Sequence, residues 1–182
     1  MIFVDFFIEK LLIKLLKTLI KMDSLNILLI GNSGSGKTSI LDATIREYYK
    51  LKKIPKHNVL YINSLKEQGI QYYRNEVKTF CQTASEISGK KKFIVLDDID
   101  LINDQSQQVF RNCIDKYSHN VHFLASCSNI QKVIDSIQSR CTIVKIKPMG
   151  LNFLQKILNK IKKNENLDIT LQAEKFILNV CN

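Results

Sequence analysis

A run of eight residues carries the strongest chemical signal in the sequence. From Gly31 to Thr38 it reads Gly-Asn-Ser-Gly-Ser-Gly-Lys-Thr and fits the pattern GxxxxGK[ST]. Glycines let the backbone turn so tightly that successive N–H groups can point at one anion. A lysine and a hydroxyl at the end of such a loop can bind nucleotide phosphates and magnesium. We therefore expect a phosphate-binding loop for ATP, formed by Gly31, Asn32, Ser33, Gly34, Ser35, Gly36, Lys37, Thr38 and Ser39.

A second acidic segment supplies what a phosphate loop needs beside it. Four apolar residues, Phe-Ile-Val-Leu, precede Asp97 and Asp98. In parallel α/β sheets the carboxyl ends of the strands form the binding edge. We assign Asp97, together with Thr38, to Mg²⁺ and Asp98 to polarising the attacking water, while Asp100 should point elsewhere.

Short apolar runs alternate with longer amphipathic stretches along most of the chain. Expected strands are 25–30, 58–63, 93–97, 121–126 and 142–146, and expected helices are 37–50, 70–88, 106–117 and 130–138. This alternation predicts an α/β fold, a five-stranded parallel sheet with helices on both faces. Two further helices, 151–163 and 171–179, suggest the start of a small helical lid. The expected domains are an N-terminal amphipathic helix (1–24), a nucleotide-binding domain (25–149) and a partial lid (150–182).

The first residues form a cationic amphipathic pattern rather than a membrane span. Its apolar runs are too short to cross a bilayer. A helix lying on a membrane surface is one reading. We favour a helix packed against the sheet, without membrane contact, because the chain runs directly into a strand. The basic stripe is Lys10, Lys14, Lys17 and Lys21, and the opposite side is Ile8, Leu11, Leu12, Leu15, Leu16 and Leu19.

The net charge and the cysteines indicate which partners and which cellular compartment suit the chain. A formal charge of +10 on 182 residues favours polyanionic partners, although a genome rich in Lys and Asn codons explains it as well. The chain has five cysteines without a CxxC pair and few histidines, which argues against a zinc site. Their odd number and wide spacing indicate reduced thiols inside a cell.

Several landmarks follow the phosphate loop in a recognisable order. They read Leu-Tyr-Ile-Asn-Ser at 60–64, Gly-Ile at 69–70 leading to Arg-Asn-Glu-Val-Lys-Thr-Phe, Gln-Gln-Val-Phe-Arg at 107–111, and Ser-Arg-Cys at 139–141. With Phe-Leu-Ala-Ser-Cys-Ser-Asn at 123–129, this order over residues 26–149 resembles AAA+ ATPases of the clamp loader group. The resemblance is strongest to replication factor C small subunits.

The resemblance implies a spiral of subunits that uses ATP to place a ring-shaped sliding clamp on primer–template DNA. Arg140 would act in trans, as an arginine finger on the γ-phosphate of a neighbouring subunit. Asn63 would restrain the catalytic carboxylate until DNA binds. Arg74 and Lys78, four residues apart on one helix face, and Arg111 would contact the DNA backbone. The implied partners are other clamp loader subunits, the clamp and DNA, in a nucleus or a viral replication compartment.

Three departures from the family pattern keep other readings open. The second acidic residue is Asp98 where the family has Glu, and Ser128 aligns with the sensor Asn, with Asn129 one step later. The lid lacks a second sensor arginine, so we expect a fragment, a split gene product or a reduced viral version. The alternatives are a non-hydrolysing assembly subunit, an origin-binding initiator and a P-loop kinase. Arg140, Arg74 and Lys78 could also be ordinary surface residues.

Overall fold

The fold is built on one sheet of parallel strands. The computed structural model describes residues 10–51, 54–63, 70–148 and 150–180. The five strands lie in the order β2-β3-β4-β1-β5 and every recorded pairing is parallel, which confirms the predicted α/β class. Their bounds are β1 (Ile27–Ile30), β2 (Val59–Asn63), β3 (Lys92–Asp97), β4 (Val121–Cys127) and β5 (Thr142–Lys145).

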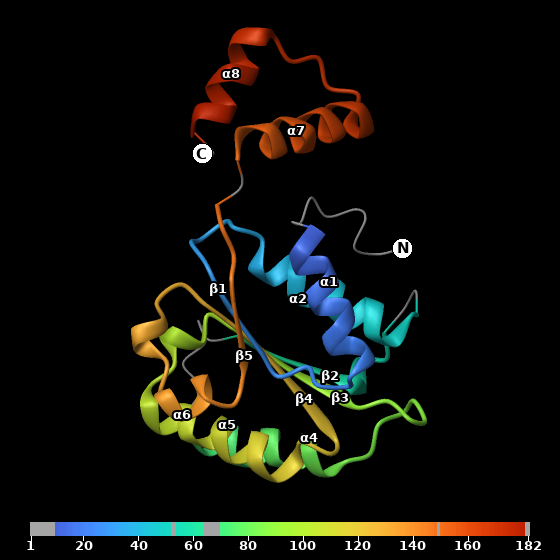
Figure 1. The fold of residues 1–182 in the computed structure, drawn as a ribbon, viewed down its shortest axis with the longest axis vertical. Helices are drawn as coiled ribbons and strands as arrows, with labels where there is room; N and C mark the ends of the chain where they lie inside the picture. Colours follow the sequence, from blue (N-terminus) through green and yellow to red (C-terminus); the bar gives the residue numbers. More distant parts are fainter. Residues whose placement is uncertain (1–9, 52–53, 64–69, 149, 181–182) are drawn as a thin grey trace. The chain divides into compact units, whose positions relative to one another are not determined.

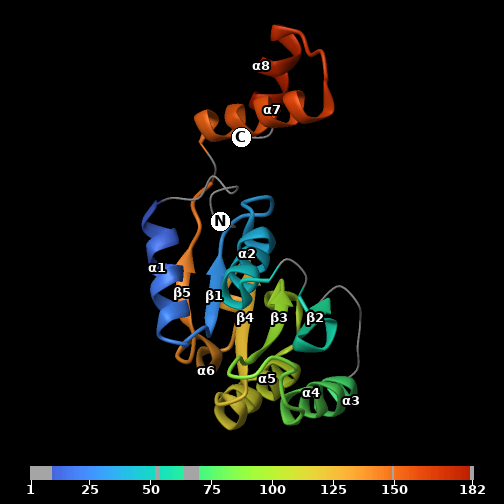
Figure 2. The ribbon, with the colours of Figure 1, turned by 90° about the vertical axis from the view of Figure 1, so that its right-hand side faces the viewer.

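Helices cover both faces of this sheet (Figures 1 and 2). On one face lie α1 (Lys10–Lys21) and α2 (Lys37–Tyr49). The other face is covered by α3 (Ile70–Tyr72), η3 (Tyr73–Val77), α4 (Lys78–Gln82), α5 (Asp104–Tyr117) and α6 (Asp135–Gln138). Three short 3₁₀ turns, η2 (Lys56–Asn58), η4 (Ile99–Leu101) and η5 (Ile130–Lys132), complete the connections.

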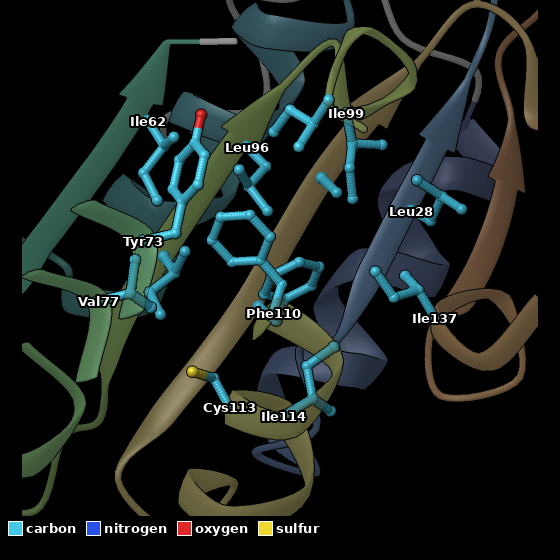
Figure 3. Packing of buried hydrophobic residues seen from close by; sticks show 14 of the residues in the cluster. Leu28, Ile62, Tyr73, Val77, Leu96, Ile99, Phe110, Cys113, Ile114 and Ile137 are labelled. Atoms are coloured by element: carbon cyan, nitrogen blue, oxygen red, sulfur yellow. The ribbon is translucent and has the colours of Figure 1, made fainter. Parts of the chain in front are cut away.

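The central strands β1, β3 and β4 are largely apolar because each contributes to two cores. On β3, Ile94 and Leu96 join the cluster under α5, whereas Phe93 and Val95 join the cluster under α2. Strands that are buried on both faces read as continuous hydrophobic runs, which is why the sequence marks them clearly. Figure 3 shows the α5 side, where Phe110 meets Tyr73 from η3 with ring centroids 5.2 Å apart.

Helix α1 packs on the sheet with part of the side that we expected, since Leu12, Leu16 and Leu19 all contact the core. Leu16 is fully buried, and Ile13 and Ile20 pack beside it. Leu11 and Leu15, which we placed on the apolar side, are exposed, Leu11 by 75%. The helix is apolar around more than half of its circumference, so the pattern alone did not select the contact side. Ile8 lies outside the described residues.

The helix expected at 70–88 ends earlier and contains a π-helical turn, so that prediction was wrong at its C-terminal end. The π turn η3 brings Tyr73 and Val77 into the core together. After Gln82 the backbone becomes extended. Two side chains from later in the chain bind the carbonyls at this end. The buried Lys92 ammonium donates to Phe80 (2.6 Å) and Thr83 (3.2 Å), and the Asn120 amide donates to Cys81 (2.7 Å) and Thr83 (2.9 Å).

The expected helix 130–138 is also wrong as a single element. The structure has η5 and the short helix α6 instead, with Val133 buried between them. Strand boundaries differ from expectation by one or two residues, which is usual for element ends. The ends matter less than the register. Asn63 lies opposite Asp97, and Ile30 lies opposite Cys127, so the carboxyl ends of the central strands share one edge.

The chain divides into two compact units, residues 1–146 and 147–182. The second unit is a helical pair, α7 (Leu151–Glu165) and α8 (Leu171–Val180), joined by an ion pair between Lys162 and Glu174. Among the described residues, no helix is both long and apolar enough to cross a membrane.

Candidate functional site: a phosphate loop beside two strand-end carboxylates

The loop between β1 and α2 needs its glycines. Gly34 and Gly36 have φ angles of 75° and 83°, a region that side chains rarely adopt. A Cβ on Gly31 would lie 2.8 Å from Ser35 Oγ and 3.0 Å from the carbonyl oxygen of Ile146. A Cβ added to Gly34 or Gly36 would have no other heavy atom within 4 Å among the described residues. The loop therefore presents bare backbone at the N-terminus of α2, where the helix dipole favours an anion.

Lys37 is the buried cation of this loop. It is only 7% exposed, and its ammonium donates to the carbonyls of Gly31 (2.8 Å) and Asn32 (3.0 Å) and to Ser128 Oγ (3.5 Å). The Ser35 hydroxyl is buried and makes no hydrogen bond within the described part of the chain. A buried hydroxyl without a recorded partner, and a lysine whose hydrogen bonds within the described residues go to neutral acceptors, fit a nucleotide phosphate. The remaining predicted loop residues, Asn32, Ser33 and Ser39, are exposed.

Asp97 meets the loop at the end of β3. Its Oδ2 accepts a hydrogen bond from Thr38 Oγ1 at 2.7 Å, and its Oδ1 accepts one from Ser126 Oγ at 2.5 Å. Ser126 is fully buried on β4, so it fixes the orientation of the carboxylate. Mg²⁺ prefers oxygen ligands, and the Thr38 hydroxyl and the Asp97 carboxylate fit that preference.

Asp98 follows in a left-handed backbone conformation, with φ 54° and ψ 55°. Asp is among the few residues with side chains that adopt this region readily. The turn is held because the Asp98 N–H donates to Ser126 Oγ at 3.0 Å. Burial and then the charge of Asp97 raise the pKa of Asp98 above its ordinary value of 3.8. A carboxylate with a raised pKa is a better proton acceptor than an ordinary one.

Asp100 ties the end of β4 to the same turn, a role that the sequence did not reveal. Its Oδ2 accepts from the backbone N–H groups of Ser128 (3.2 Å) and Asn129 (2.9 Å). This holds Ser128 with its hydroxyl toward Lys37. The Asn129 side chain instead accepts from the N–H of Gln131 at 3.0 Å and begins η5. Of the two sensor candidates, Ser128 is the one in contact with the phosphate loop.

Arg140 lies at the end of α6 and makes its contacts away from the phosphate loop. Its Nε donates to Asp115 Oδ1 at 2.5 Å, and its Nη1 donates to the Ser136 carbonyl at 2.7 Å. The hydrogen bond from Arg140 lowers the pKa of Asp115. Asp115 lies on α5, and Arg111 of the same helix has its Nε 3.3 Å from Asp115 Oδ2. Two residues with different predicted roles thus share one carboxylate.

The remaining predicted residues lie apart from this edge or outside the described side chains. Arg74 on η3 and Lys78 on α4 are both exposed, as a DNA contact requires. Asn63 ends β2 opposite Asp97, but its side chain lies outside the described residues.

Gln107 is a buried polar residue to which the sequence reasoning gave no role, and it joins α5 to the segments around η4 and η5. It is fully buried on α5, where its amide donates to the carbonyls of Ile102 and Lys132, both at 2.8 Å. Its carbonyl oxygen accepts from the Ile134 N–H at 2.9 Å. The signal was present in the Gln-Gln landmark, because a glutamine at a core position of a helix needs several partners.

Comparison with known proteins agrees with this geometry. Residues 27–149 match the family described as "ATPase family associated with various cellular activities (AAA)". The replication factor C small subunit of Methanoregula boonei is 30% identical over 148 residues, which cover 81% of this chain and 45% of the relative. Human replication factor C subunit 4 is 31% identical, and the match covers 96% of this chain and 50% of that protein. The chain therefore spans half or less of the length of these relatives.

Solved structures share the fold at lower identity. A DNA polymerase III gamma subunit-related protein from Thermotoga maritima has a TM-score of 0.67 at 19% identity, covering 92% of this chain and 54% of that chain. A RuvB structure from Thermotoga maritima has a TM-score of 0.71 at 14% identity, covering 96% of this chain and 57% of that chain. The chain belongs to the AAA family of ATPases and, within it, is similar to replication factor C small subunits.

Proposed function

We propose that this chain is an ATP-binding clamp loader subunit, which couples ATP binding and hydrolysis to loading a sliding clamp on primer–template DNA. The observation that carries the nucleotide site is the hydrogen-bonded series from Thr38 to Asp97 to Ser126, beside Lys37. The names of the relatives, replication factor C small subunits, support the clamp loader assignment. Other subunits of the assembly, the clamp and DNA are its proposed partners, in a nucleus or a viral replication compartment.

Nucleotide binding uses groups that are already in place. The backbone N–H groups of the glycine loop and the N-terminus of α2 receive the phosphates. Lys37 exchanges its bonds to the Gly31 and Asn32 carbonyls for phosphate oxygens, a gain because a full negative charge replaces neutral acceptors. Thr38 and Asp97 hold Mg²⁺, which supplies charge neutralisation at the phosphates.

Hydrolysis requires a proton acceptor and a stabiliser of developing charge. Asp98 takes the proton of the water whose oxygen attacks the γ-phosphorus, as the bond to ADP breaks. Ser128 lies beside Lys37 and senses the γ-phosphate. Arg140 reaches the nucleotide of a neighbouring subunit. Asn63, at the end of the strand next to Asp97, restrains the catalytic carboxylate until DNA binds.

DNA engagement uses basic residues of η3, α4 and α5, of which Arg74 and Lys78 are exposed and Arg111 is half-buried. Arg74, Lys78 and Arg111 contact phosphates, which gives affinity without sequence preference. The basic net charge of +10 supports a polyanionic partner.

A second candidate function has its own support. In this reading the chain binds ATP and DNA but does not hydrolyse ATP, and contributes only Arg140 to a neighbour. Asp98 is one methylene shorter than glutamate, and the sensor position carries the Ser128 hydroxyl. Positioning of the attacking water depends on small distances, so both substitutions favour slow or absent turnover.

A mixing experiment tests the proposal. ATP turnover is measured with primed DNA and the cognate clamp and subunits, for wild type, Lys37→Ala and Arg140→Ala. Lys37→Ala should lose ATP binding in calorimetry, whereas Arg140→Ala should bind ATP normally and lose turnover. Mixing the two variants should restore part of the activity, because the intact Arg140 of one serves the intact loop of the other. Wild-type chains that bind ATP but never turn it over would favour the second candidate. Wild-type chains that bind no nucleotide would refute both.

A further inference from the structure

One carboxylate, Asp115, lies between two arginines from different parts of the chain. Arg140 comes from the segment after α6, and Arg111 lies one helical turn before Asp115 on α5. Arg140 Nε donates to Oδ1 at 2.5 Å, whereas Arg111 Nε lies 3.3 Å from Oδ2. Ion pairs at this exposure contribute little to stability, so fold stability alone does not explain the arrangement.

The guanidinium of Arg140 is fixed on two sides and open on the third. Nε is held by Asp115, and Nη1 by the Ser136 carbonyl at 2.7 Å and Ser139 Oγ at 3.4 Å. No hydrogen bond or ion pair of Nη2 is recorded among the described residues, and the side chain is 30% exposed. A guanidinium held in this way keeps one N–H edge directed outward without losing further rotamer freedom on binding.

Arg111 is held much more loosely by the same carboxylate. Its Nε is buried and lacks a hydrogen bond in the described part of the chain, so its contact with Asp115 is one of charge alone. The hydrogen bond of its guanidinium goes instead from Nη1 to Asn112 Oδ1, at 3.0 Å. A phosphate at α5 can therefore attract Arg111 without breaking a hydrogen bond to Asp115. Arg111 then offsets less of the field of Asp115 at Arg140 and repels Arg140 less, so the net electrostatic attraction that holds Arg140 increases.

We propose that Asp115 is the positioning residue of Arg140, and that a polyanion bound by Arg111 strengthens this hold. The inference rests on the proposed function, in which Arg140 acts on the nucleotide of a neighbouring subunit. It adds a direct connection between the DNA-facing helix α5 and the residue that completes the adjacent active site. Asp115 touches neither nucleotide nor DNA in this scheme, since it acts only through the two arginines.

The first test uses the isolated chain and does not depend on turnover. The Nε–H signal of Arg140 is followed by ¹⁵N NMR, and is assigned from its loss in Arg140→Lys. Hydrogen exchange at Nε should become at least tenfold faster in Asp115→Asn and partly slow again in Asp115→Glu. The matched control is Asp104→Asn, which removes an exposed carboxylate from the first turn of α5 and should leave the exchange rate at Arg140 Nε unchanged.

Adding a short primed DNA duplex to the same sample tests the connection. The Arg140 Nε–H exchange should slow further in wild type, but not in Arg111→Gln. Exchange that is equally fast in wild type and Asp115→Asn refutes the positioning role. An identical DNA response in Arg111→Gln refutes the connection.

The second test measures ATP turnover in the assembled system. Asp115→Asn should lower kcat by about 10- to 100-fold, the effect of a small misplacement of a catalytic group, with unchanged KM for ATP. Asp115→Glu should recover part of the rate. Adding Lys37→Ala chains, which supply an intact Asp115 and Arg140, should rescue the Asp115→Asn defect in trans.

The outcomes separate this inference from the proposed function. If Arg140→Ala turns over ATP like wild type, the trans role of Arg140 is wrong. If Arg140→Ala is inactive but Asp115→Asn is normal, the trans role stands and the positioning role of Asp115 fails. A defect in Asp115→Asn that Lys37→Ala chains do not rescue also overturns the inference, because Asp115 would then act within its own subunit.

Discussion

Replacing Asp98 with asparagine isolates the chemistry of one carboxylate at nearly constant structure. Asn adopts the left-handed conformation seen at Asp98 (φ 54°, ψ 55°) as readily as Asp does. The hydrogen bond that holds the turn comes from the Asp98 backbone N–H to Ser126 Oγ, so it survives the change. We expect the free energy of unfolding to change by less than about 0.5 kcal/mol.

The expected catalytic loss is much larger than the structural one. An amide cannot accept the proton of the attacking water, and loss of a general base costs about 10²–10⁴-fold, or about 3–5 kcal/mol in activation free energy. The pKa of Asp98 is raised first by burial and then by Asp97, so wild-type turnover should fall in acid as this carboxylate gains its proton. That acidic limb should lie above pH 3.8 and be missing from the residual activity of Asp98→Asn.

The assay follows phosphate release, with ATP affinity from calorimetry and stability from urea unfolding. Asp104→Asn, at an exposed site on α5, controls for loss of one negative charge. ATP affinity should stay within about threefold of wild type, because magnesium is assigned to Thr38 and Asp97. Turnover by Asp98→Asn within twofold of an active wild-type assembly would show that another group accepts the proton.

Four further changes test the rest of the site and the fold. The double variant Arg74→Ala, Lys78→Ala should reduce the slope of log affinity against log salt by about two units in DNA anisotropy titrations, and an unchanged slope would make them surface residues. Ser126→Ala should weaken the magnesium dependence of ATP binding by about tenfold in calorimetry, since Asp97 loses an orienting bond; an unchanged dependence would contradict this. Burial lowers the pKa of His122 from 6.5 to about 4, so on acidification the unfolded state gains this proton at a higher pH than the folded state does. The free energy of unfolding should therefore fall by up to about 3 kcal/mol between pH 6.5 and pH 4. Urea unfolding should show this loss in wild type and less of it in His122→Gln. Gln107→Ala leaves buried backbone groups unpaired and should lower the free energy of unfolding by about 2–4 kcal/mol in the same assay. A loss below about 0.5 kcal/mol would contradict this expectation.

The sheet could be predicted because its signal is local. Strands with both faces buried, such as β3 with Phe93 to Leu96, read as continuous apolar runs, and the phosphate loop carries its own spacing. The end of α4 could not be predicted, because Lys92, which binds its last carbonyls, lies ten residues beyond Gln82 on another element. The exposure of Leu11 was missed for a related reason, since the helix offers several apolar sides and the sheet selects one.

In the candidate site too, residues within a local motif could be predicted, whereas residues that act through distant partners could not. Residue types placed Lys37, Thr38 and Asp97 together, because each follows from a motif with fixed chemistry. The groups that orient them did not stand out, since Ser126 and Asp100 act through hydrogen bonds to partners 28 or 29 residues away. Such partners become visible only when the carboxyl ends of β3 and β4 lie side by side.

The packing of α1 has a practical consequence for how this domain is handled. The family match begins at residue 27, and a recombinant piece cut there would begin at the first residue of β1. It would remove Leu16, which is fully buried, and uncover the side chains of α2 and the strands that α1 shields. Such a piece should aggregate or bind hydrophobic dyes. Expression should therefore start upstream of residue 10, even when only the nucleotide site is under study.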